Sequence, residues 1–334
     1  MPAVFFNRMF SVRVAMFCAS LALASLAHVA LAVIIDTEFG TENTTPPADD
    51  PGFANVGARG ELTGVYVGNR WVLTANHVGG GDIVLGSGTY SMAPGTGFQL
   101  SNPAGSGAST YADLCMYQLT VDPGLPWLDI AAVSSGSGTA VTMIGNGLNR
   151  GDLASWLVNT GTNPWAWAEN MVNPNAAGYL WAPGNTIRWG TNNVAGSTWA
   201  NAGFGDTFSG YTTFSFFPDY SSECQAAYGD SGGAVFRKDG TSWQLAGIIG
   251  GLGSYSGQPA NTAVYGNNTY YADLSVYRPQ IVAVVPEPGT VGLAVAAVAT
   301  GILGRGLRRR SRSKPWPGSK RRMVRAENLE RRAL

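Results

Sequence analysis

The chain has 334 residues, of which 45% are hydrophobic and 11% aromatic, so it can bury a large core and is not disordered throughout. Its formal net charge is zero, but twelve of its 21 Lys and Arg residues lie from residue 305 onward. Residues 33–304 carry seven basic against nineteen acidic side chains, a net charge near minus twelve. A body of that charge repels phosphate backbones, so nucleic acid is not an expected partner.

The first 32 residues have the features of a secretory signal peptide. Two arginines precede an apolar run over 14–27, and small residues occupy the positions before Val33 that a signal peptidase reads. A membrane span needs about 20 apolar residues, so this run is short for an N-terminal anchor, which is the alternative. We predict a signal helix within residues 1–32, cleavage after Ala32 and a mature chain that begins at Val33.

The body that follows is predicted to be all-β. It is rich in Gly, Ser, Thr and Asn, and few of its stretches sustain a helical period, which is typical of short strands joined by tight turns. Only Cys115 and Cys224 remain after signal cleavage, so there is no disulfide framework, and one bridge or two buried thiols are both open. No Cys/His cluster has zinc spacing and no Gly-rich loop precedes a Lys, so neither a metal nor a cofactor is expected.

Two short stretches carry residues with catalytic chemistry. His77, the only histidine of the predicted mature chain, follows the strand-like run 70–76 and should lie in a tight turn. Ser231 lies among glycines at residues 229–233, just before an apolar strand, and these glycines permit positive φ and close approach of a substrate. Each stretch alone has a structural alternative, because a lone histidine is more often structural and Asp-Ser-Gly-Gly is good turn chemistry.

Together, the histidine block at 71–78 and the serine block at 229–235 resemble the trypsin-like serine proteases. The chain order of histidine, aspartate and serine also agrees with that family and differs from subtilisins and α/β-hydrolases. The resemblance implies a chymotrypsin-type fold of two six-stranded antiparallel β-barrels, over about residues 33–135 and 136–283. It also implies a serine endopeptidase that acts on proteins or peptides through an acyl-enzyme intermediate.

The resemblance leaves two candidates for the catalytic acid. Asp113 begins a run to residue 119 that resembles the aspartate strand of the family, and residues 140–147 resemble the strand that opens the second barrel. Asp129 has an equally good local context but leaves too little chain before that second barrel. We therefore predict a triad of His77, Asp113 and Ser231.

The resemblance also predicts the surroundings of the triad. The backbone N–H groups of Gly229 and Ser231 would form the oxyanion hole. Counting back from Ser231 places Gln225 at the base of the specificity pocket, and a neutral amide there argues against a requirement for Lys or Arg. A small misalignment would bring Glu223 there instead. Residues 245–251 offer glycine where the family often has a serine that hydrogen-bonds the buried aspartate, so Asp113 needs another donor or the alignment slips by one.

Asp230 lies beside the predicted nucleophile and is expected to be buried if the family fold applies. A buried charge needs a partner. In the family this partner is the α-ammonium of an inserted apolar N-terminus, and Val33 with the two isoleucines after it has this character. Arg188 is the alternative partner, and both remain open.

Residues 156–220 are rich in tryptophan, tyrosine and phenylalanine. We interpret them as strands and loops of the second barrel. The alternative is that exposed rings bind glycans, which would make the chain a non-catalytic protease homologue acting as a matrix-binding or glycan-binding surface protein, or a scaffold. The presence of all three triad residues favours the enzyme.

The C-terminal part resembles the PEP-CTERM sorting signal of bacterial envelope proteins. Pro286-Glu287-Pro288 precedes an apolar run over 289–304 and an arginine cluster at 305–310, and residues 313–334 form a basic tail that runs past the usual end of such signals. Residues 284–312 are thereby expected to hold a short hydrophobic helix, to contact the membrane transiently and to be cut by a sorting protease. The product would be secreted or held at the cell envelope of a bacterium, and membrane-anchored until processed. A plain C-terminal anchor with cytoplasmic arginines is the alternative.

Overall fold

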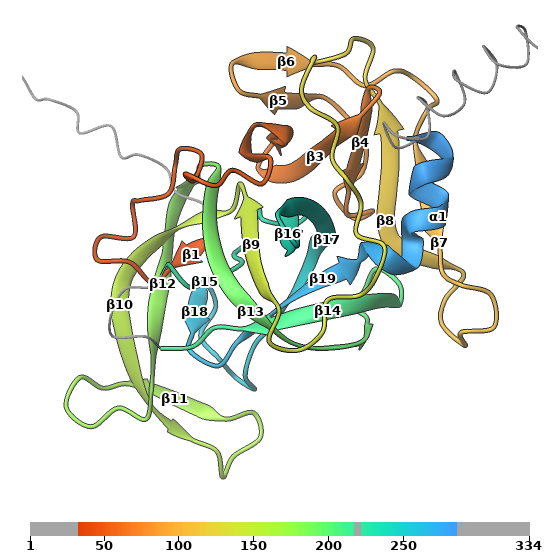
Figure 1. The fold of residues 1–334 in the computed structure, drawn as a ribbon. Helices are drawn as coiled ribbons and strands as arrows, with labels where there is room; N and C mark the ends of the chain where they lie inside the picture. The colour runs from red at the N-terminus through yellow and green to blue at the C-terminus, as the bar shows by residue number, and fades with distance from the viewer. Residues whose placement is uncertain (1–32, 217–221, 286–334) are drawn as a thin grey trace, which may run out of the picture.

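The computed structural model describes residues 33–216 and 222–285 of the chain. The predicted signal helix and the predicted C-terminal hydrophobic helix lie outside these residues. The described chain is built mainly of β-strands, with a single α-helix in that part (Figure 1).

The first half forms a seven-stranded antiparallel sheet, in the upper right of Figure 1, with the order β6-β5-β2-β3-β4-β8-β7. A short 3-10 helix, η1 (Phe53–Asn55), precedes it. The strands are β2 (Val56–Arg59), β3 (Leu62–Gly68), β4 (Trp71–Thr74), β5 (Ile83–Leu85), β6 (Gly88–Tyr90), β7 (Phe98–Ser101) and β8 (Tyr111–Gln118).

The second half forms a closed barrel with the order β13-β14-β19-β17-β16-β9. The barrel closes because β9 pairs with both β13 and β16, so no strand of it is left as an edge. Its strands are β9 (Ala140–Gly145), β13 (Arg188–Ala200), β14 (Thr207–Thr213), β16 (Ala234–Asp239), β17 (Ser242–Gly253) and β19 (Asn268–Asp273).

A four-stranded sheet with the order β11-β10-β12-β18 projects from the barrel at the lower left of Figure 1. The register of β10 on β12 shifts twice, and such irregularities bend a strand and increase its twist. Its strands are β10 (Leu148–Asn159), β11 (Ala166–Glu169), β12 (Ala176–Asn185) and β18 (Thr262–Val264). The prediction that residues 156–220 form strands and loops of the second barrel is therefore wrong for β11 and β12, which lie in this separate sheet.

The first described residues are buried in the body. Strand β1 (Ile34–Ile35) pairs with β15 (Cys224–Gln225), and all four residues are buried. The start of the described chain is therefore anchored against the segment that leads to Ser231.

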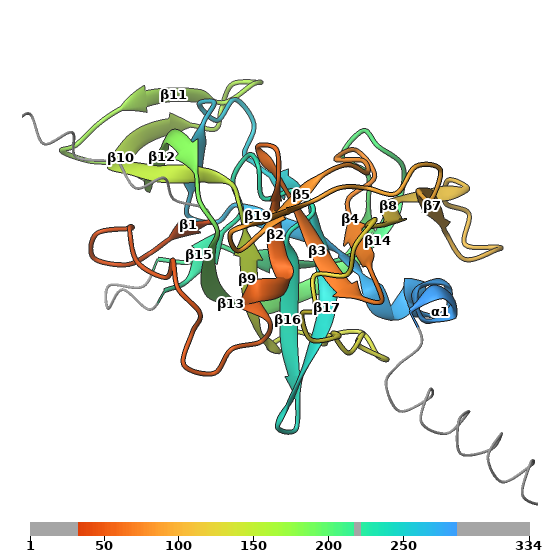
Figure 2. The same ribbon diagram turned by 90° about the horizontal axis from the view of Figure 1, so that it is seen from above.

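Helix α1 (Leu274–Val284) begins at Asp273, whose carboxylate accepts a hydrogen bond from the Ser275 N–H at 3.0 Å, a capping arrangement. The helix lies at the right of the molecule in both views (Figures 1 and 2), and its Gln280 side chain is hydrogen-bonded to Ser101 of β7. Its buried side chains join a core that runs without a break between the sheet and the barrel, made of residues such as Leu73, Leu114, Ile144, Phe236, Ile248 and Tyr277.

The predominantly β fold is confirmed, and so is one closed six-stranded barrel. A second closed barrel is not confirmed, because the first half is a seven-stranded sheet that ends at β6 and β7. Cys115 and Cys224 are separate buried thiols, so the option of a bridge between them is wrong. No helix in the described residues is long and apolar enough to cross a membrane.

Candidate active site

His77 lies in the turn just after β4, as the sequence predicts. The turn is closed by hydrogen bonds from the N–H groups of Val78 and Gly79 to the Ala75 carbonyl, at 3.1 and 3.2 Å. The imidazole Nδ1 lies 2.7 Å from Asp113 Oδ2, and the backbone N–H of His77 donates to Asp113 Oδ1 at 2.9 Å. One aspartate therefore holds both the ring and the backbone of His77.

Asp113 is the third residue of β8 and is 6% exposed. Its own backbone N–H donates to Thr207 Oγ1 at 2.8 Å, which connects β8 to the second half. The rival Asp129 lies between β8 and β9, where its carbonyl accepts a hydrogen bond from the Leu245 N–H. The carboxylate placed on His77 is thus that of Asp113.

Ser231 lies in a tight turn that requires glycine on both sides. Gly229 and Gly232 have φ of +99° and +85°. A Cβ at Gly229 would lie 2.6 Å from the Glu61 carbonyl oxygen, and one at Gly232 would lie 2.2 Å from Thr74 Oγ1. The turn is therefore packed against the end of β4, three residues before His77.

Thr63, on β3, fastens this turn to the first half. Its backbone N–H donates to the Ser231 carbonyl at 3.0 Å, and its hydroxyl donates to the Gly229 carbonyl at 2.8 Å. The Thr74 hydroxyl in turn donates to the Thr63 carbonyl. Sequence reasoning missed this threonine, because nothing in its local pattern marks it.

Asp230 is completely buried beside Ser231. Its carboxylate accepts hydrogen bonds from the N–H groups of Ala227 and Gly147, at 2.7 and 2.8 Å, and from the backbone of Val33. Burial raises its pKa to about 7, although these bonds and the charge of Arg188 act in the opposite direction. Both partners that the sequence left open, Val33 and Arg188, therefore act on this carboxylate.

Arg188 is fully buried, and burial lowers its pKa to about 10. Its guanidinium Nε donates to the Glu42 carbonyl, and the charges of Glu42 and Asp230 favour its protonated form. Arg188 thus contributes positive charge near Asp230 while it binds the N-terminal segment.

Two cavities flank the end of β17, and Leu252 lines both. The smaller, of about 150 Å³, is also lined by Gln225 and Asn267. Gln225 is 2% exposed, and its Nε2 donates to Asn267 Oδ1 at 3.5 Å. Glu223 does not line this cavity; it is buried, receives a hydrogen bond from the Ser215 N–H, and has its pKa raised by burial.

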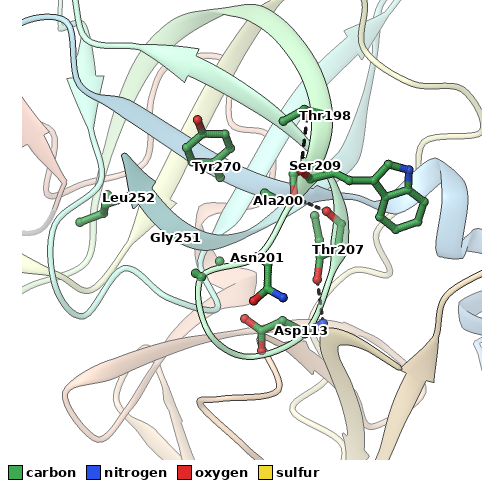
Figure 3. A pocket seen from close by; sticks show the side chains of 14 residues that line it. Asp113, Thr198, Ala200, Asn201, Thr207, Ser209, Gly251, Leu252 and Tyr270 are labelled. Atoms are coloured by element: carbon green, nitrogen blue, oxygen red, sulfur yellow. Dashed lines mark hydrogen bonds between the residues drawn. The ribbon is translucent and has the colours of Figure 1, made fainter. Parts of the chain in front are cut away.

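The larger cavity, of about 410 Å³, lies on the Asp113 side of β17 (Figure 3). Asp113 and Asn201 face its lower end, and Leu252 and Tyr270 lie at the other end. Gly250 and Gly251 form part of its wall, and a Cβ at Gly250 would lie 3.9 Å from Asp113 Oδ2. The glycine at the position where the family often has serine therefore does face Asp113.

The described residues, 33–216 and 222–285, contain no group of three or more His, Cys, Asp and Glu side chains placed to hold a metal ion. Cys115 lies on β8 close to Asp113, and burial raises the pKa of its thiol to about 12. Neither feature adds a second reactive centre to the site.

The trypsin family model matches residues 43–274, which is more than half of the chain. No match to the chain was found among curated proteins. Among solved structures it is similar to human heparin binding protein, with 14% identity, 74% of this chain and 96% of that chain covered, and a TM-score of 0.45. Neuropsin, a serine protease of mouse brain, has 18% identity, with 73% of this chain and 98% of that chain covered and a TM-score of 0.44. The Rv3671c protease of M. tuberculosis has 14% identity, with 70% of this chain and 90% of that chain covered and a TM-score of 0.39. At these values the similarities to solved structures add no argument to the family match.

Proposed function

The chain belongs to the trypsin family and is a serine endopeptidase, and from that premise we propose that Ser231 is its nucleophile, His77 its general base and Asp113 its orienting acid. The observation that carries this assignment is the 2.7 Å contact between His77 Nδ1 and Asp113 Oδ2. The packing of the Ser231 turn on the end of β4 supports it.

A serine hydroxyl is a weak nucleophile at its free pKa, so it needs a base. His77 takes the Ser231 proton as Oγ attacks the peptide carbonyl, and it returns a proton to the leaving amine. Asp113 holds the ring in the tautomer that leaves Nε2 free to accept, and stabilises the imidazolium. Water then releases the acyl group by the same proton transfers in reverse.

The backbone N–H groups of Gly229 and Ser231 form the oxyanion hole in this proposal. The loss of one such donor typically costs about 2.7–4 kcal/mol of the barrier. The residue that supplies the scissile carbonyl enters the cavity lined by Gln225. Because that cavity presents an amide and not a carboxylate, the enzyme does not require Lys or Arg there.

We also propose that the enzyme reaches its active form on export. Cleavage after Ala32 gives Val33 an α-ammonium close to the Asp230 carboxylate, with Arg188 as the alternative counter-charge. A sorting protease then acts at the segment from Pro286 onward after transient membrane contact, and the product is secreted or held at the bacterial envelope.

A fluorophosphonate probe and a peptide library test the triad. We expect the secreted protein to react at Ser231, and Ser231→Ala or His77→Ala to abolish cleavage in a folded domain. Asp113→Asn should reduce kcat by several powers of ten, about 10⁴ in the reference serine protease, because the tautomer is wrong. The matched control Asp129→Asn should cost little.

If Asp129→Asn reduces kcat by several powers of ten and Asp113→Asn costs little, the orienting acid is Asp129. An unreactive Ser231 in a folded protein would favour the alternative of a non-catalytic, matrix-binding or glycan-binding homologue. The aromatic rings do not favour that alternative, because Trp165 and Trp167 pack on Tyr255 and Trp167 also packs on Trp156.

A further inference from the structure

An aromatic side chain from the second half lies on the catalytic histidine. The ring of Phe204 stacks on the His77 imidazole, with centroids 4.3 Å apart and planes at 18°. Phe204 is 50% exposed, whereas the His77 side chain is only 14% exposed. A large apolar ring therefore covers one face of the imidazole and still presents surface to a substrate.

The loop that carries this ring, residues 201–206 between β13 and β14, is fastened to the first half. The Asp206 N–H donates to Ser109 Oγ and the Ser109 N–H donates to Asp206 Oδ2, each at 2.8 Å. Asn102 Nδ2 donates to the Asp206 carbonyl at 2.7 Å. Within the loop, Asn201 Nδ2 donates to Asp206 Oδ1 at 3.0 Å. Asp206 is thus the residue that holds the loop.

The loop also passes close to the strand that carries the catalytic acid. Gly205 has a φ of +110°, and a Cβ there would lie 3.0 Å from the carbonyl oxygen of Tyr111 on β8. Only glycine adopts this conformation at this distance without strain. The position of Phe204 is therefore set by backbone packing as well as by hydrogen bonds.

The two cavities indicate how a substrate runs through the site, given the proposed protease function. Leu252 lines both the cavity of Gln225 and the cavity of Asp113. Successive side chains of an extended peptide point to opposite sides. If the residue that supplies the scissile carbonyl enters the Gln225 cavity, the side chain before it points to the Asp113 side. His77 contacts Asp113 there, and Phe204 is stacked on His77.

We propose that Phe204 is a specificity-determining residue that selects substrates with glycine or alanine immediately before the residue that supplies the scissile carbonyl. The inference rests on the proposed catalytic roles of Ser231 and His77. A bulky side chain at that position must displace the phenyl ring from the imidazole or clash with it. A single methylene changes selection in a pocket by about 10-fold to 200-fold, so the preference should be large.

The test uses four peptides that differ only at that position, with Gly, Ala, Leu or Phe, and compares the secreted wild type with Phe204→Ala. The wild type should cleave the Gly and Ala peptides with a kcat/KM at least about tenfold higher than the Leu and Phe peptides. Phe204→Ala should remove this preference, chiefly by lowering KM for the bulky peptides. Equal cleavage of all four by the wild type, or an unchanged preference in Phe204→Ala, would overturn the inference.

Two further variants separate the ring from general effects on the fold. Phe39, which is 68% exposed and belongs to the N-terminal segment, provides a matched control, and Phe39→Ala should keep the wild-type preference. Asp206→Ala keeps the ring but releases its loop, and should weaken the preference partly. Circular dichroism checks that each variant is folded.

Labelling with a small fluorophosphonate tests the protease function separately from the role of Phe204, because this probe carries no peptide side chain to meet Phe204. An unlabelled wild type would refute the protease function and this inference together. Labelling of both wild type and Phe204→Ala, with identical peptide preferences, would refute the inference alone.

Discussion

Asp113 receives two hydrogen bonds from one residue, since both the ring and the backbone N–H of His77 meet its carboxylate. Gly250 faces Asp113 Oδ2. Because glycine has no side chain, Asp113 lacks the hydroxyl donor that a serine at this position often supplies in the family. The orientation of the imidazole therefore depends on the two His77 contacts and on the Phe204 ring stacked on it.

Asp230 gives a pH dependence that a single substitution isolates. In a form in which a peptide bond precedes Val33, burial raises the pKa of Asp230 to about 7, whereas an unfolded aspartate titrates near 3.9. Between these values the folded state binds more protons, so the free energy of unfolding falls as the pH rises. This contribution is fully present below about pH 4 and is lost by about pH 7, and it amounts to at most about 4 kcal/mol.

Asp230→Asn cannot ionise at this position, so the variant should lack that decline. The comparison uses Asp230→Asn and the unsubstituted protein, both in the form in which a peptide bond precedes Val33. Urea unfolding between pH 4 and 7 measures the difference in their free energies of unfolding, in which contributions common to both proteins cancel. If the difference is constant across this range, Asp230 is ionised in the fold throughout, and its hydrogen bonds and Arg188 outweigh burial.

At the scale of elements, the N-terminal segment is held by arginines through its backbone. Arg150 donates to the carbonyls of Ile35 and Thr37 at 2.9 and 2.7 Å, and Arg188 donates to that of Glu42. The Asp36 carboxylate accepts a hydrogen bond from the Tyr179 hydroxyl at 2.7 Å. These contacts fasten β1 to the barrel and to the projecting sheet, and they bring Val33 to Asp230.

The export proposal predicts that this segment controls activity. A few residues inserted between Ala32 and Val33 leave an uncharged amide at Val33 after signal cleavage, so the ammonium that would order the oxyanion loop is absent. We expect kcat/KM for a peptide substrate to fall at least about tenfold, the equivalent of 1.4 kcal/mol.

The same residues appended after Val285 serve as the control and should leave the rate unchanged. If the form extended at Val33 cleaves substrate as fast as the unextended one, the inserted-terminus proposal is wrong and Arg188 is the sufficient partner of Asp230.

At the scale of the whole molecule, the two halves share one core, and α1 closes it. Val285, just after α1, is still buried in that core. Gln280 on α1 and Ser101 on β7 exchange two hydrogen bonds, at 2.8 and 2.9 Å, so the helix is fixed to the first half. The described residues end at Val285, just inside the predicted sorting segment, which begins at residue 284.

The sorting proposal therefore predicts a mature product that lacks the segment beyond Pro288 but keeps its activity. Mass spectrometry of the protein isolated from its native host checks this, because peptides from 321–334 should be missing from the secreted form. A chain truncated after Val285 should have wild-type kcat/KM. Recovery of the 321–334 peptides from the secreted protein would leave a plain membrane anchor as the explanation.

The sequence by itself determined the parts of this protein that local chemistry encodes. The Ser231 turn needs glycine at 229 and 232 whatever surrounds it, and an apolar run followed by small residues ends in the turn that holds His77. These blocks predicted the family and the candidate residues, and the all-β body followed from glycine content and the lack of a helical period.

Only the tertiary structure decided which distant residues meet. Asp113 and Asp129 have equally good local contexts, and the pairing of β8 with β4 is what places Asp113 on His77. The stack of Phe204 on His77, the projecting sheet and the open first half all depend on contacts between segments far apart in the chain. Such contacts leave no periodic signal, because the packing of the whole fold selects them and no single stretch of sequence does.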